Sequence, residues 1–163
     1  MGDRRKMKGR GSVGTRSFLF AITILLPLAG NLPPISAAAD PKLKENALTA
    51  TVLAVNGAEA AQSTVAALSG DPGVERSGCP GYIGSAVEYL KGGVKVLKSP
   101  ASESAAAGAK LVVASALREQ RRCLAGIGLA GVHPDTLKYI WEIVSSARQW
   151  TEKADLALRN LHP

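Results

Sequence analysis

Aromatic residues, cysteines and histidines are all scarce in this chain of 163 residues, and each scarcity excludes a class of structure or chemistry. Aromatic side chains make up 4% of the sequence, while alanine, leucine, valine and serine are abundant. Small and unbranched side chains favour closely packed helices, whereas β-rich domains need branched and aromatic residues. The composition therefore predicts an all-α protein.

Groups that could carry catalysis or hold a metal are poorly placed in the sequence. His133 and His162 lack a second histidine or a carboxylate at a ligand spacing such as His-x-x-x-His. The cysteines form no Cys-x-x-Cys motif and have no neighbouring histidine, which argues against a redox or nucleophilic role. A Gly-x-Gly-x-x-Gly pattern at 126–131 follows a predicted helix, where a dinucleotide-binding fingerprint requires a strand. We expect no enzyme activity, no metal and no cofactor.

The first 39 residues have the organisation of a targeting segment. Residues 1–17 are rich in lysine and arginine, the run 18–30 is apolar, and small side chains occupy 37–39. This order is typical of a secretory signal peptide. A transmembrane helix needs about 20 apolar residues, and Pro27 interrupts this shorter run. We therefore expect cleavage after Ala39, leaving one domain, 40–163, that is secreted and not held in a membrane.

Most of the positive charge belongs to that segment. The chain has 20 Lys and Arg and 13 Asp and Glu, a net charge of +7. Residues 40–163 retain 14 basic and 12 acidic side chains, a net charge of +2. This domain has no basic stripe with interleaved aromatics, so we expect no nucleic-acid partner. Its one local cluster, formed by Arg118, Arg121 and Arg122, is interpreted as a solvated helix face.

Four segments show apolar residues at the helical spacings of three and four. The predicted inner faces are, in chain order, Leu48, Val52, Val55, Ala58, Ala61, Val65 and Leu68; Ile83, Val87, Leu90, Val94 and Leu97; Ala109, Val112, Ala116, Cys123 and Ile127; and Leu137, Ile140, Val144, Ala147, Thr151, Ala154, Leu158 and Leu161. Residues 69–73 are predicted to be a turn. Ser99 is predicted to cap the third helix, with Pro100 in its first turn. Glycines at 126–131 mark a fraying end of that helix.

Long helices joined by short links pack up-down-up-down, which predicts a four-helix bundle. Cys79 and Cys123 lie at equal distances on either side of residue 101. If helices two and three fold back there, the start of one lies beside the end of the other, within reach of a disulfide. The bond would close a loop of about 45 residues, stabilise the fold by about 4 kcal/mol, and favour an oxidising compartment.

Residues 79–90 begin with the first cysteine, residues 115–123 end with the second, and residues 154–158 lie in the last predicted helix. Together these stretches resemble the plant invertase/pectin methylesterase inhibitor family, and the resemblance covers roughly residues 43–161. The family pattern of a cysteine followed by an Ala-Val-x-x-Leu set is matched by Ala86, Val87 and Leu90. Its Ala-Leu pair before the second cysteine is matched by Ala116 and Leu117.

The chain also departs from that family. The helical hairpin with its own disulfide, which usually begins members, is absent between Asp40 and Leu43. Arg118 stands where a threonine is common, Ile127 where an aromatic is expected, and Asp155 where an asparagine is usual. These departures leave the core pattern intact, so the resemblance supports the fold more than the inhibitory activity.

The resemblance implies a proteinaceous inhibitor that acts in the apoplast, or cell wall space, by covering the active-site cleft of pectin methylesterase. Its contact surface is placed on outward polar positions of helices two and three, namely Ser85, Glu88, Lys91, Lys95, Lys110, Arg118 and Arg121. Inhibition of acid invertase is the alternative, although the Pro-Lys-Phe element of invertase inhibitors is missing. A bundle without inhibitory activity and a lipid-surface protein with amphipathic helices are further alternatives.

Overall fold

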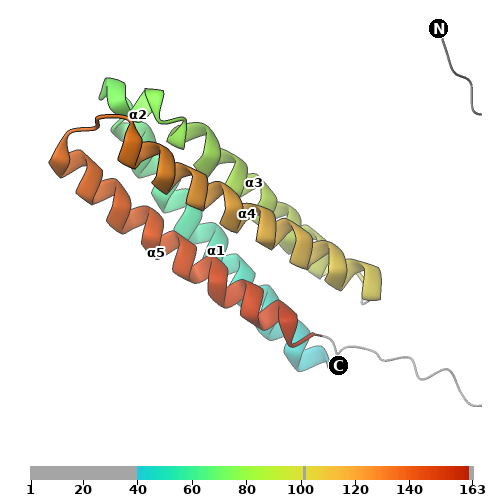
Figure 1. Ribbon diagram of the computed structural model, residues 1–163. Coiled ribbons are helices and arrows are strands. Elements are labelled where there is room, and N and C mark those ends of the chain that lie inside the picture. Colours follow the sequence, from blue (N-terminus) through green and yellow to red (C-terminus); the bar gives the residue numbers. More distant parts are fainter. Residues whose placement is uncertain (1–39, 101, 162–163) are drawn as a thin grey trace, which may run out of the picture. The chain divides into compact units, whose positions relative to one another are not determined.

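The computed structural model describes residues 40–100 and 102–161, so the predicted signal peptide lies outside the described residues. The described part is all-helical and contains five helices: α1 (Pro41–Ala67), α2 (Pro72–Arg76), α3 (Cys79–Lys98), α4 (Glu103–Leu129) and α5 (Pro134–Arg159). Figure 1 shows the four long helices lying side by side. The α1 helix packs against α3 and α5, and α4 packs against the same two helices. No described helix has the length and hydrophobicity that crossing a membrane requires.

The predicted inner faces are confirmed at most positions of α3, α4 and α5, whereas in α1 the prediction holds only in the second half of the helix. In α5, every predicted position from Ile140 to Leu158 is buried, Leu137 is half-buried, and Leu161 is buried just after the helix ends. In α3, four of the five positions are buried and Val94 is half-buried. In α4, four of the five positions are also buried, and the structure buries Val113 in place of Val112, which is half-buried. In α3 and α5, most of the larger aliphatic side chains face the core.

The α1 helix buries the predicted residues Ala58, Ala61 and Val65 in its second half, but a different set from the one predicted in its first half. Its buried residues are Ala47, Thr51, Ala54, Ala58, Ala61 and Val65, whereas Val52 is 38% exposed. Leu48 and Val55 are only half-buried. A row of alanines lets neighbouring helices approach α1 more closely than leucine or valine would, so size rather than hydrophobicity decides which side faces the core.

Two segments between the helices also differ from the sequence-based expectation. The predicted turn at 69–73 leads into the short helix α2, which Asp71 begins by accepting a hydrogen bond from the Gly73 amide at 2.7 Å. The cap of α4 is Ser102 and not Ser99, because the Ser102 hydroxyl accepts from the Ala105 amide at 3.1 Å. Pro100 lies in the link before α4.

A disulfide joins Cys79, the first residue of α3, to Cys123 in α4, which confirms the predicted pairing. Both cysteines are fully buried, and they lie in a core cluster with Val74, Ile83 and Ile127. Gly78 immediately precedes Cys79 in the sequence. Its φ is +69°, a left-handed conformation that favours glycine. We call this region, where α2, the start of α3 and the end of α4 meet, the disulfide end.

The end of α4 does not fray at its glycines, because the helix continues through Gly126 to Leu129. A Cβ atom at Gly126 would overlap the carbonyl oxygen of Ser77, whose hydroxyl accepts from the Cys79 amide at 3.0 Å. Gly126 is therefore required by the close approach of two backbones beside the disulfide.

Asp71 ties α2 to the segment that enters α5. Its second carboxylate oxygen accepts from the His133 amide at 3.3 Å. The hydrogen bonds from Gly73 and then from His133 hold the pKa of Asp71 below its ordinary value. A lowered pKa means that the charged carboxylate contributes stability above the ordinary value, and this stability is lost as the pH falls through the folded-state pKa.

Asp71→Asn is accordingly expected to reduce the loss of stability on acidification from about pH 5 to about pH 2, because the pKa of Asp71 is lowered below the ordinary value of an aspartate. Thermal unfolding of both proteins across this range measures the difference. Asp135→Asn is the matched control, since its side chain is 96% exposed, and it should retain the wild-type acid dependence. An identical acid dependence in wild type and Asp71→Asn would contradict this role.

Candidate partner-binding site

The seven predicted contact residues lie on α3 and α4, and six of them are exposed. Lys110 is the exception because it is half-buried. Ser85, Glu88, Lys91 and Lys95 belong to α3, while Lys110, Arg118 and Arg121 belong to α4. The side chains on the two helices make different contacts.

The α3 residues are partly engaged with α1. The Lys91 ammonium lies 3.0 Å from the Glu59 carboxylate of α1 and 3.9 Å from the Glu88 carboxylate on its own helix. The hydrogen bond and the charge of Glu59 raise the pKa of Lys91 above its ordinary value. Exposed pairs of this kind contribute little stability, but they occupy the ammonium. Lys91 is therefore less available to a partner than its exposure suggests.

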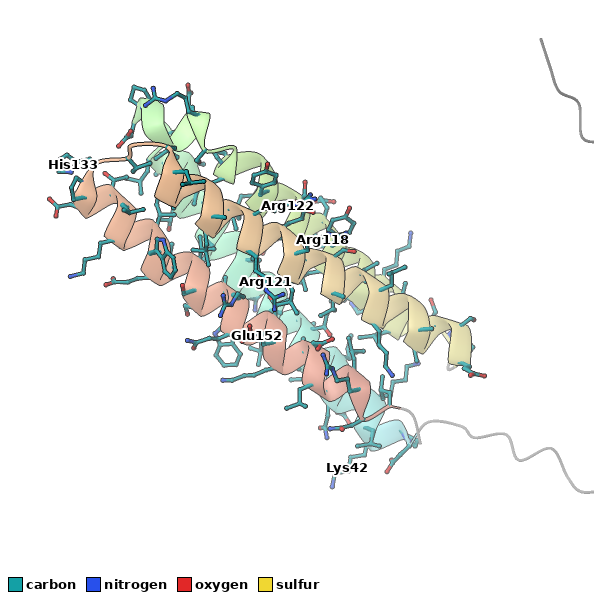
Figure 2. All side chains as sticks on the ribbon, in the orientation of Figure 1. Lys42, Arg118, Arg121, Arg122, His133 and Glu152 are labelled. Carbon is teal, nitrogen blue, oxygen red and sulfur yellow. A yellow bond between two sulfur atoms is a disulfide. The ribbon has the colours of Figure 1, made fainter. Side chains whose placement is uncertain are left out.

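The three arginines of α4 do not form one solvated cluster. Figure 2 shows Arg121 on the side of α4 toward α5, whereas Arg118 and Arg122 lie on the other side. Arg118 and Arg122 both form ion pairs with Glu119, a residue that is only 6% exposed. Arg122 Nη1 donates to the two carboxylate oxygens at 3.0 and 3.3 Å, and Arg118 Nε lies 3.7 Å from one of them. The predicted solvated face thus contains a buried carboxylate that organises two guanidinium groups.

Sequence reasoning missed Glu119 and a second buried polar group. Gln120 is fully buried, and its Nε2 donates to Thr151 Oγ1 of α5 at 3.0 Å. Thr151 in turn donates to the Ala147 carbonyl at 3.0 Å. The only sequence signal for Glu119 is an acid placed one residue after Arg118 and three before Arg122, a spacing that permits helical ion pairs.

Among the described residues, no group of three or more histidine, cysteine, aspartate or glutamate side chains could hold a metal ion. His133 is exposed at the start of α5, with its Nδ1 4.0 Å from Asp135, and His162 lies outside the described residues. A hollow of about 260 Å³ between α1 and α5 is lined by Leu43, Asn46, Lys153, Leu156, Ala157 and Asn160. Its lining offers one cation but no carboxylate or imidazole for acid–base work.

The described fold and side chains define an all-helical, disulfide-linked protein with a charged outer surface on α3 and α4. The chain matches no family model, no curated protein and no solved structure. Its function is therefore inferred from its own residues and from the sequence resemblance.

Proposed function

We propose that residues 40–163 form a secreted protein inhibitor that binds pectin methylesterase and covers its active-site cleft. In this proposal the four long helices form an up-down-up-down bundle, and residues 1–39 direct the chain to the secretory pathway before they are removed. The inhibitor acts in the apoplast, requires no cofactor, and performs no chemistry on the enzyme or its substrate.

The observation that carries the proposal is the Cys79–Cys123 bond between the start of α3 and the part of α4 near its end. It joins the two helices to which the family resemblance assigns the enzyme contact. A covalent clamp between them reduces the conformational freedom that binding would otherwise remove, and preorganisation of this kind increases affinity. The outward charged side chains of both helices supply polar groups that a partner can contact.

We expect the disulfide-bonded chain that begins at Asp40 to inhibit a plant pectin methylesterase with one-to-one stoichiometry. Esterase activity is titrated against increasing inhibitor, and recovery of both intact proteins excludes cleavage or consumption. Acid invertase is assayed in parallel and should remain fully active. Inhibition of invertase alone would support the alternative target, and inhibition of neither enzyme would refute the proposal.

A further inference from the structure

Four exposed side chains form a straight row along α4. Leu111, Arg118, Arg122 and Leu129 are separated by seven, four and seven residues. At 3.6 residues per turn, these intervals place all four within about 20° of one line on the helix surface, over a length of about 27 Å. Leu111 is 70% exposed and Leu129 is 90% exposed, so the row has two apolar ends and a cationic centre. We call these four residues the α4 row.

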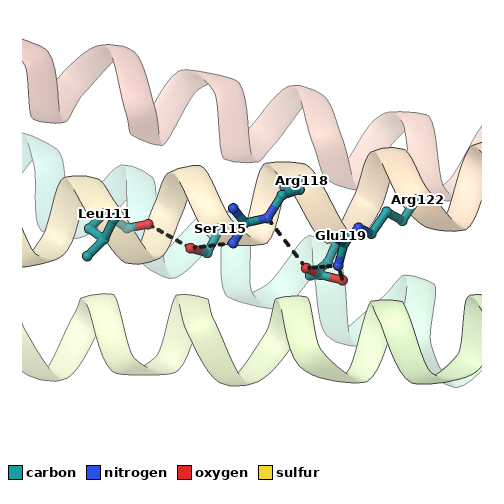
Figure 3. Close-up of polar contacts among 5 residues, drawn as sticks. All are labelled: Leu111, Ser115, Arg118, Glu119 and Arg122. Atoms are coloured by element: carbon teal, nitrogen blue, oxygen red, sulfur yellow. Dashed lines mark hydrogen bonds and ion pairs between the residues drawn. The ribbon is translucent and has the colours of Figure 1, made fainter. Parts of the chain in front are cut away.

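Neighbouring polar side chains of α4 hold the two arginines at the centre of the row in place. Figure 3 shows a continuous chain of polar contacts along α4 from the Leu111 carbonyl to Arg122. The Ser115 hydroxyl donates to the Leu111 carbonyl at 3.0 Å and accepts from Arg118 Nη2 at 3.3 Å. Arg118 and Arg122 then share the buried carboxylate of Glu119. Each guanidinium is thereby fixed through some of its donors, while the side chains remain 60% and 56% exposed.

This arrangement suits recognition of carboxylates. A guanidinium has five N–H donors in a planar fork that matches a carboxylate, and only some of them are used internally here. Arginines whose geometry is already fixed lose less freedom when a partner binds. Ala114 and Ala125 flank the arginines with small exposed side chains, which allows a partner surface to approach the helix closely.

We propose that the α4 row is the docking surface for an acidic patch of the target enzyme, with Glu119 as its positioning residue. The partner patch carries carboxylates for Arg118 and Arg122 between two apolar depressions for Leu111 and Leu129. Charge complementarity and the exposed leucines together favour a protein surface over an acidic polysaccharide, which would offer no apolar depressions. This inference rests on the proposed function and narrows its contact surface from α3 and α4 to one row on α4.

The test compares variants in the esterase titration described above. Arg118→Gln with Arg122→Gln should weaken inhibition by about tenfold or more, as expected for central arginines at an interface. Lys42→Gln with Lys138→Gln is the matched control, because it removes the same charge from exposed positions on α1 and α5 and should leave inhibition unchanged. Leu111→Ala with Leu129→Ala should weaken inhibition severalfold. Thermal unfolding of each variant establishes that the fold is retained.

Glu119→Gln separates positioning from charge. This change makes the protein one unit more positive, so a surface that acts by charge alone would bind an acidic partner more tightly. Loss of the shared carboxylate frees both guanidinium groups, and we expect inhibition to weaken severalfold instead.

The other outcomes overturn the inference. Tighter inhibition by Glu119→Gln, or equal losses in the arginine and lysine pairs, would show that only net charge acts. Binding of polygalacturonate that is lost in the arginine pair, with inhibition unaffected, would assign the row to the polysaccharide. If wild-type protein inhibits no esterase, the proposed function itself fails. If wild type inhibits and the α4 variants inhibit equally well, only the docking surface is wrong.

Discussion

Replacing Cys79 with serine is expected to lower the free energy of unfolding by about 2–5 kcal/mol. The disulfide spans 44 residues, and a cross-link over a loop of this length removes substantial entropy from the unfolded chain. The hydrogen bonds of α3 and α4 lie within each helix, so helix content in the folded protein should change little. Urea denaturation followed by circular dichroism measures both quantities.

Reduction of the wild-type protein is the companion measurement. Because both cysteines are fully buried, Cys79→Ser also places a hydroxyl in an apolar environment, which costs additional free energy. Reduced wild type lacks the cross-link without this cost and should fall between oxidised wild type and the variant. Unchanged unfolding after complete reduction would mean that the bond does not stabilise the fold.

Gly126→Ala is expected to destabilise the protein by about 1–3 kcal/mol, the usual cost of an overpacked site. In an exposed part of a helix the same substitution is stabilising, since glycine is a poor helix former. Here the added methyl group meets the carbonyl oxygen of Ser77, and backbone cannot move aside as a flexible side chain can. The end of α4 must therefore shift away from the segment that leads into Cys79.

Gly128 provides the matched control because it lies two residues later in the same helix. An added Cβ atom at Gly128 would have no neighbour within 4 Å. Gly128→Ala should stabilise the protein by about 0.5–1 kcal/mol. The two variants should differ by at least about 1.5 kcal/mol in the free energy of unfolding. Equal effects would show that Ser77 and Gly126 are not in close contact.

The buried face of a helix was predictable from the sequence where its larger aliphatic side chains all lie on that face. In α3 and α5 the large aliphatic residues recur at intervals of three and four, and their burial follows directly from that pattern. Only the second half of α1 was predictable in this way. In the first half, the leucine and valines indicate one face, but the helix turns Ala47, Thr51 and Ala54 to the core. Which side chains fit there depends on how closely α3 and α5 pack against α1, and one helix's pattern does not contain that information.

Features that depend on contacts between distant segments were also missed. Ser99 and Ser102 both precede the third long helix, and only the structure shows which hydroxyl reaches a helical amide. The five residues of α2 are too few to display a period. The burial of Glu119 has no local signal beyond its arginine neighbours, so the sequence predicts a solvated face for Arg122 as well. The cysteine pair was predictable because symmetry about the link restricts the geometry of a helical hairpin.

Because the disulfide is buried, its oxidation state can change only when the surrounding structure is open. Thiol–disulfide exchange requires a thiolate to reach a sulfur atom, and both sulfurs belong to residues with no exposed surface. A reductant can therefore react only with molecules in which the disulfide end has opened, so the rate of reduction reports how often that opening occurs. The two thiols can likewise be oxidised only while the disulfide end is open, as it is during folding. The oxidation state of the folded protein is therefore set by the redox conditions in which the chain folds.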